Sequence, residues 1–220
     1  MSDATLVAEA ALRELGAPSQ WRTPRGYPDS LALCVIDSVF SLRSRYRSVE
    51  NALDSYRAVR GALGADADRD GAPQLVDAIL RAGGPENASV VLFANQSRAP
   101  GTRRLKAAAI MDGAQGLIDT GVRTTADLRR ALGASRADVR SRWLSVPGLG
   151  PISWDYLAML AGEDGVKADT WVVRHVTRVA GEPVSASRAA EALIGAAEIL
   201  GVSTKTLDHR IWLYESGRDS

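Results

Sequence analysis

The sequence of 220 residues contains one cysteine, Cys34, and two histidines, His175 and His209. A single cysteine excludes a disulfide framework within the chain, and we expect a reducing compartment. With one cysteine, the two histidines also form no zinc-binding spacing. The composition therefore does not indicate a metal enzyme.

Long apolar runs and nucleotide-binding glycine loops are missing as well. No stretch reaches the roughly 18 apolar residues that a membrane span needs, and the first residues lack the pattern of a signal peptide. Gly148 and Gly150 have neither a third glycine nor a preceding strand, so they do not form a dinucleotide fingerprint. We therefore expect a soluble, cytoplasmic protein.

The chain as a whole has no large excess of positive or negative charge, because the formal net charge is only +1. The segment 93–142 is the exception, with ten Lys or Arg residues against four Asp. Such a local surplus suits either a nucleic-acid surface or a set of solvated helix faces.

Helical periodicity dominates the rest of the chain, so we predict an all-α protein. Asp29 or Ser30 can cap one helix that extends to Arg45. A short strand or helix is predicted at 89–93. The other predicted helices span 5–15, 48–60, 73–81, 105–120, 125–132, 136–145, 152–161, 170–180, 187–201 and 204–217.

A Val-Pro-Gly-Leu-Gly run at 146–150 separates two of these helices. Glycines adopt positive φ at little cost and let another backbone come close, so this run predicts a tight hairpin. The amides at the start of the next helix form an anion site, and a DNA phosphate fits it. Asp169 follows Gly150 by nineteen residues, in the sequence Asp-Thr-Trp.

The segment from Arg142 to Arg178 resembles the helix-hairpin-helix and catalytic-aspartate block of the endonuclease III-like DNA glycosylases, the HhH-GPD superfamily. Arg174 and Arg178 continue the match, and the helix from Ser30 resembles the family's opening helices more loosely. The resemblance implies one unit of two helical lobes: a central lobe at about 27–132, and a second formed by the N-terminal helix with 133–220. Many relatives carry a four-cysteine iron–sulfur cluster, which this chain cannot hold.

For Asp169, the resemblance implies catalysis. A carboxylate beside the sugar stabilises the oxocarbenium character that develops as the glycosidic bond breaks, and it can orient or deprotonate a water. The alternative is that Asp169 only caps a helix. The family's Schiff-base lysine falls at Ile152 here, which implies hydrolysis by water without strand cleavage. Lys167 lies near Asp169 but does not match the position of that nucleophile.

At the hairpin, the resemblance implies that the amides of Gly148 and Gly150 contact phosphate, with Leu149 between them as part of the same DNA-binding turn. It also implies a monovalent cation on backbone carbonyls, those of Leu144, Val146 and Leu149. Binding of this kind is independent of DNA sequence. Arg43 takes the place of a family glutamine that fills the gap left by a flipped base, and Arg174 is a further candidate DNA contact.

The base itself would be recognised by stacking and by hydrogen bonds to its edge. Trp154, Tyr156 and Trp171 are candidates for that pocket, and each also suits a packing role. Asp37 interrupts a very apolar helix, where adenine-removing relatives place a carboxylic acid. It could instead pair with Arg43 or Arg45.

We therefore expect a nucleoid-associated, monofunctional DNA glycosylase that acts as a monomer on double-stranded DNA with a damaged, mismatched or modified base. No cofactor is expected beyond the cation at the hairpin. The alternative is a catalytically silent DNA-binding protein that recognises distorted or modified DNA. Which base is removed depends on pocket geometry, which the sequence does not reveal.

Overall fold

The computed structural model describes residues 2–218, and the regular secondary structure of this part of the chain is helical. It contains twelve α-helices and two short 3-10 helices, η1 (Pro18–Gln20) and η2 (Ala67–Arg69). The described residues form no β-strand, and their β-structure is limited to an isolated antiparallel bridge between Arg98 and Leu105. The prediction of an all-α protein is confirmed. None of the described helices is both long and apolar enough to cross a membrane.

The chain divides into two compact units, and the boundary lies between Glu163 and Asp164. The larger unit is Gly26–Glu163, and the smaller one joins residues up to Arg25 with those from Asp164 onward. We expected 133–163, which includes the hairpin, in the same lobe as the C-terminal helices. The structure instead packs this segment with the larger unit, because Trp143 and Trp154 are buried in that unit's core.

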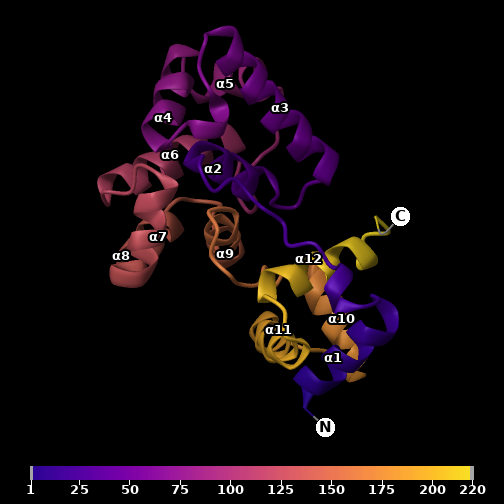
Figure 1. The fold of residues 1–220 in the computed structure, drawn as a ribbon. Helices are drawn as coiled ribbons and strands as arrows, with labels where there is room; N and C mark the ends of the chain where they lie inside the picture. Colours follow the sequence, from indigo (N-terminus) through magenta and orange to yellow (C-terminus); the bar gives the residue numbers. More distant parts are fainter. Residues whose placement is uncertain (1, 219–220) are drawn as a thin grey trace. The chain divides into compact units, whose positions relative to one another are not determined.

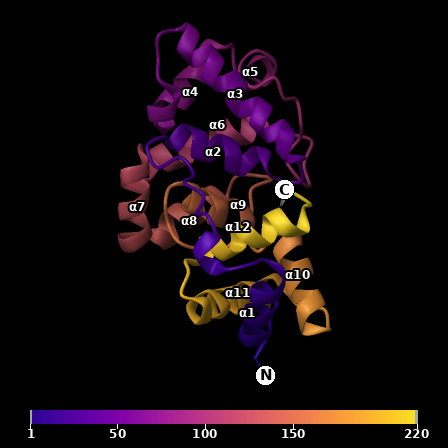
Figure 2. The ribbon, with the colours of Figure 1, turned by 45° about the vertical axis from the view of Figure 1, so that its right-hand side comes forward.

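The helix α2 (Leu31–Phe40) is the centre of the larger unit, and all ten of its residues are buried. Figures 1 and 2 show it among the helices that cover it, with α3, α4, α6 and α9 all in contact with it. The other helices of this unit are α3 (Tyr46–Ala62), α4 (Ala72–Arg81), α5 (Pro85–Val91), α6 (Lys106–Asp119), α7 (Thr125–Ala134), α8 (Arg136–Leu144) and α9 (Pro151–Leu160).

The smaller unit has its own apolar core, in which α1 packs along α11, as Figure 2 shows. Close approach is possible because a Cβ at Gly195 would lie 2.8 Å from the Cβ of Ala4. Serine side chains cap three of its helices: Ser2, Ser185 and Ser203. Its helices are α1 (Asp3–Glu14), α10 (Thr170–Ala180), α11 (Ala186–Leu200) and α12 (Thr204–Glu215).

One predicted helix differs in length from the structure. The helix expected to reach Arg45 ends at Phe40, and Arg43 has a φ of 50°, which no helix accommodates. Of the two alternatives for 89–93, the helix is the one observed, since residues 89–91 belong to α5 and the segment forms no strand. Ser30 is confirmed as the cap of α2, because its hydroxyl accepts a hydrogen bond from the amide of Leu33.

The early end of α2 depends on a buried lysine from α6. Lys106 Nζ donates to the carbonyls of Phe40 at 2.9 Å and Leu42 at 2.6 Å, and to the hydroxyl of Ser44 at 2.7 Å. Burial lowers the pKa of Lys106 to about 8. The lysine therefore satisfies carbonyls at the end of α2 that helical geometry leaves without donors.

Replacing this lysine tests the cap. Lys106→Met removes three donors while keeping most of the apolar stem, and should lower the free energy of unfolding by about 1–3 kcal/mol. The control is Lys205→Met, at a half-buried position where the backbone amide, and not the side chain, donates a hydrogen bond to Asp164. Chemical denaturation measures both, and an equal effect of the two substitutions would refute this role.

Candidate nucleic-acid interface and carboxylate site

The hairpin between α8 and α9 has one position that only glycine fits. Gly148 has a φ of 95°, and a Cβ there would lie 2.5 Å from the Cβ of Ala99. The loop that contains Ala99 therefore packs directly on the hairpin. The sequence predicted the turn, whereas its contact with a loop about fifty residues earlier is a result of the tertiary fold.

The hairpin amides do not all remain available to a ligand. Leu149 donates its amide to the carbonyl of Val146 at 3.0 Å, and Gly150 donates to Ser153 Oγ at 3.1 Å. The amides of Gly148 and Ile152 have no acceptor within the described chain. Phosphate binding by Gly148 stays a prediction. The amide of Gly150 already donates to Ser153 in the cap of α9. The amide of Ile152 is therefore the better second donor to a phosphate.

Ser153 is a residue that sequence reasoning missed. Its hydroxyl accepts hydrogen bonds from Trp143 Nε1 at 3.0 Å and from the amide of Gly150, and donates to the carbonyl of Gly150 at 2.7 Å. One side chain thus joins the two helices of the hairpin. A serine three residues after a glycine N-cap was the available signal for a capping box.

The expected cation site uses carbonyls of this same turn. Val146 already accepts the amide of Leu149, and a carbonyl oxygen keeps a second lone pair for a cation. The other two carbonyls are those of Leu144 and Leu149. Cation binding here stays a prediction.

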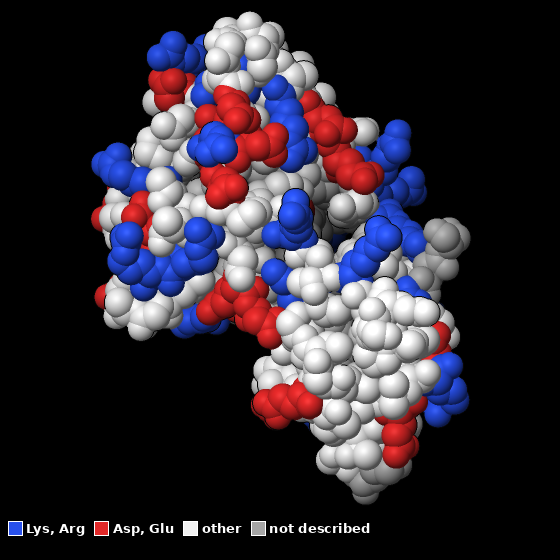
Figure 3. Space-filling model, in the orientation of Figure 1, with Lys and Arg blue, Asp and Glu red and all other residues white. Residues whose placement is uncertain are grey.

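Six of the ten cations of the predicted basic surface are used within the larger unit. Four of its arginines pair with carboxylates, namely Arg104 with Asp112, Arg130 with Asp127, Arg136 with Glu163 and Arg142 with Asp119. Two more of the ten cations serve the fold, because Lys106 caps α2 and Arg129 donates to the carbonyl of Ala161. Figure 3 shows Lys and Arg side chains gathered over α7 and α8, with acidic groups among and below them.

Besides Arg129, four arginines of this segment form no ion pair in the described chain: Arg98, Arg103, Arg123 and Arg140. Arg98 and Arg103 are both exposed and belong to the loop that packs on Gly148 through Ala99. Arg98 also donates to the carbonyl of Arg103, which ties the loop together. The basic surplus that remains unpaired is therefore partly concentrated beside the hairpin.

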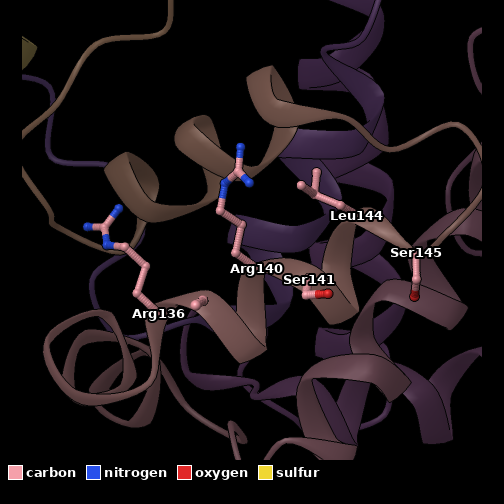
Figure 4. Close-up of a pocket in the computed structure, with 6 residues that line it drawn as sticks. Arg136, Arg140, Ser141, Leu144 and Ser145 are labelled. Atoms are coloured by element: carbon pink, nitrogen blue, oxygen red, sulfur yellow. The ribbon is translucent and has the colours of Figure 1, made fainter.

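One face of α8 and the turn after it line an open pocket of about 690 Å³. Figure 4 shows Arg136 and Arg140 extending from α8 on the same side of the pocket. Burial raises the pKa of the half-buried Asp155 of α9. The positive charges of Arg140 and Arg136 oppose this shift but are weaker than the effect of burial. The two arginines are the charged residues among those that line the pocket, and acidic groups interact with them: Glu163 pairs with Arg136, and Asp155 interacts with both.

Asp169 is the N-cap of α10. Its Oδ1 accepts the amides of Trp171 at 2.8 Å and Val172 at 3.4 Å, whereas Oδ2 has no hydrogen-bond partner in the described chain. The capping interpretation is therefore confirmed. Catalysis stays a prediction, and the geometry leaves one carboxylate oxygen for it.

A second carboxylate of the smaller unit, Asp208 on α12, lies near Asp169 and was not predicted. It is 8% exposed, and its Oδ1 accepts the amide of Lys167 at 3.1 Å. Burial and the negative charge of Asp169 raise the pKa of Asp208 to about 8, against a smaller opposing effect of Lys167. The available signal was an Asp between Leu207 and Ile211 on the buried face of a helix.

Arg174 and Trp171 lie together on α10, with the guanidinium 5.9 Å from the centroid of the indole. The Arg174 side chain is 66% exposed and has a loose ion pair with Glu215 at 3.6 Å. By contrast, Arg178 is bound into the fold by Glu14 at 2.6 Å. The predicted DNA contact at Arg174 is therefore accessible.

The remaining predicted positions belong to the larger unit. Asp37 is 2% exposed and accepts hydrogen bonds from the hydroxyls of Tyr27 at 3.0 Å and Ser41 at 2.7 Å. Burial and the Asp37 charge raise the pKa of Tyr27. Trp154 is 1% exposed, which favours its packing role over stacking on a base, and Tyr156 is half-buried against the same core. Arg43 is exposed.

The family model described as "Domain of unknown function (DUF8548)" matches residues 5–216 of this chain. Comparison with curated proteins found no match, and comparison with solved structures found none either.

The hairpin glycines provide a matched test of the geometry. Gly148→Ala forces alanine into positive φ and into contact with Ala99, so the free energy of unfolding should fall by about 2 kcal/mol or more. Gly150→Ala meets no atom within 4 Å and should cost less than about 1 kcal/mol. Chemical denaturation of both variants measures the difference, and similar values would contradict the packing described here.

Proposed function

Because the chain belongs to the DUF8548 family, a domain family of unknown function, we propose its function from its own residues: it is an HhH-GPD-type, monofunctional DNA glycosylase. It binds double-stranded DNA at the hairpin, rotates a damaged or modified nucleotide out of the duplex, and hydrolyses the bond between the sugar and the base. The observation that carries the proposal is the combination of the Gly148 hairpin with Asp169, a carboxylate that keeps one oxygen unbonded.

The hairpin supports the DNA-binding half of the proposal. Two unused amides, those of Gly148 and Ile152, belong to the same short turn, and Arg98 and Arg103 belong to the loop packed against it. Backbone amides at a helix start and flanking arginines both favour phosphate, whatever the DNA sequence. The chain can therefore bind DNA through a local surface even though its net charge is only +1.

Asp169 supports the catalytic half. The amides of Trp171 and Val172 donate hydrogen bonds to one oxygen of the carboxylate, and the positive end of the helix dipole stabilises its charge. The other oxygen can take a proton from an attacking water or face the developing positive charge on the sugar. Ile152 brings no amine, so the product is an abasic site in an uncut strand, together with the free base.

Asp37 is the second carboxylate of the proposal. A buried acid hydrogen-bonded to two hydroxyls can protonate a departing purine if it gains a proton on binding. Arg174 and Trp171 of the smaller unit are proposed as further DNA contacts.

A silent DNA-binding protein is the second candidate, and one observation favours it. The cap of α10 fully explains why an aspartate is present at position 169. In that case the hairpin would bind DNA and no base would be released.

DNA binding is tested with two exposed arginines that have no ion pair in the described chain. Arg103→Gln should weaken binding to a duplex and reduce the salt slope, log K against log salt concentration, by about 0.9, because one phosphate contact is lost. Arg123→Gln removes the same charge from the turn before α7, away from the hairpin loop in sequence, and should leave the slope nearly unchanged. Equal slopes for both variants would count against the hairpin as the DNA site.

Catalysis is tested with Asp169→Asn, since asparagine also caps helices and so preserves α10. Duplexes that each contain one damaged or modified base are incubated with the wild type or the variant, and alkali then reveals abasic sites. The wild type should produce cleavage only after alkali, and the variant should lose it by about 100-fold or more. Salt-dependent binding without release from any duplex would favour the silent binder.

A further inference from the structure

The segment that leads to Asp169 is attached to α12 at two points. Asp164 accepts the amides of Thr204 at 3.1 Å and Lys205 at 2.8 Å, at the start of α12. One turn further along α12, Asp208 accepts the amide of Lys167 at 3.1 Å. The backbone carbonyl of Lys167 in turn accepts the amide of Asp169 at 2.5 Å. The position of Asp169 therefore depends on α12.

The two attachments differ in their chemistry. Asp164 is exposed and bonded to amides at a helix N-terminus, where a carboxylate is stable. Asp208 is 8% exposed, has one hydrogen bond, and lies near the negative charge of Asp169. An ionised carboxyl is costly in such a place, so the neutral acid is favoured.

We propose that Asp208 is a positioning residue that works as a neutral acid: it holds the Lys167 amide, and with it Asp169, without placing a second negative charge beside the first. This inference rests on the catalytic role proposed for Asp169. When Asp208 loses its proton, the two carboxylates repel each other and the segment 167–169 shifts away from α12.

Two charges act on Asp208 from the elements around it. Asp169, at the start of α10, raises the pKa of Asp208, and Lys167 lowers it less strongly. The charged side chains of α11, the third element packed on α12, are not among the groups that shift it: Arg188, Glu191 and Glu198. Above the pKa of about 8, the Asp169 charge is therefore the main source of repulsion.

A test that needs no substrate follows the thermal midpoint of unfolding, Tm, from pH 4 to 9 for the wild type and Asp208→Asn. The folded wild type keeps a proton on Asp208 that the unfolded chain releases near pH 4, so the contribution of Asp208 to stability falls as pH rises towards 8 and is level above that. Asparagine has the shape of the neutral acid and does not titrate. The Tm of the wild type minus that of the variant should therefore decline from pH 4 to about 8.

Asp169→Asn sharpens this test, because it removes a charge that raises the pKa of Asp208. When both proteins carry Asp169→Asn, the difference in Tm between the form with Asp208 and the form with Asp208→Asn should stop declining at a lower pH. A Tm difference that is constant with pH, or an end point that Asp169→Asn does not move, overturns the proposal. If Asp208→Asn folds poorly, the difference in Tm between the wild type and Asp169→Asn over the same pH range still reports on Asp208, because His175 and His209, whose pKa values are lowered by burial, are present in both proteins.

The consequence for activity is measured as the single-turnover rate of base release against pH. The wild type should lose rate above about pH 8, whereas Asp208→Asn should match it at pH 7 and keep its rate at pH 9. Asp164→Asn is the control, since it weakens the other attachment and should lower the rate equally at all pH values. An alkaline loss that persists in Asp208→Asn overturns the proposal while the glycosylase function stands. If neither the wild type nor any variant releases a base, the proposed function is refuted. The Tm titration then decides the Asp208 proposal by itself.

Discussion

The complete burial of α2 is the constraint on which the larger unit depends. A helix with no exposed residue must satisfy its ends and its polar side chains inside the protein. Ser30 caps its start, Lys106 satisfies carbonyls at its end, and Asp37 accepts hydroxyls of Tyr27 and Ser41. The lysine comes from α6, so the end of α2 and the start of α6 are formed together.

This arrangement also determines where the hairpin is built. The helix α6 contacts both α2 and α8. Gly113 of α6 leaves room for the ring of Trp143, because a Cβ at position 113 would lie only 2.9 Å from that ring. Trp143 then donates to Ser153, which caps α9 through Gly150. A chain of contacts therefore links the buried helix to the turn that we propose as the phosphate site. These contacts would hold the turn in one conformation before DNA binds, which lowers the entropic cost of binding.

In the smaller unit the main constraint is electrostatic. α10 begins with a carboxylate, α12 brings a second one close to it, and burial disfavours two negative charges there. One carboxyl takes the hydrogen bonds of a helix start and the other remains a neutral acid at neutral pH. Pairs of acids with different pKa values are common at catalytic sites and also occur in structural networks. Base release is the measurement that distinguishes a catalytic pair from a structural one.

The sequence by itself determined the all-α class, the location of most helices, the hairpin with its glycine, and the cap at Asp169. Each of these depends on residues within a few positions of one another, through helical periodicity, capping side chains and the conformational freedom of glycine. The tertiary structure alone decided that α2 ends at Phe40, that four of the nine arginines of 93–142 form ion pairs, that the hairpin belongs with the larger unit, and that Asp208 lies near Asp169. The partners involved are remote in sequence: Lys106 is 66 positions from Phe40, and Asp208 is 41 from Lys167. No local pattern specifies such contacts, because packing of the whole unit selects which distant side chains meet.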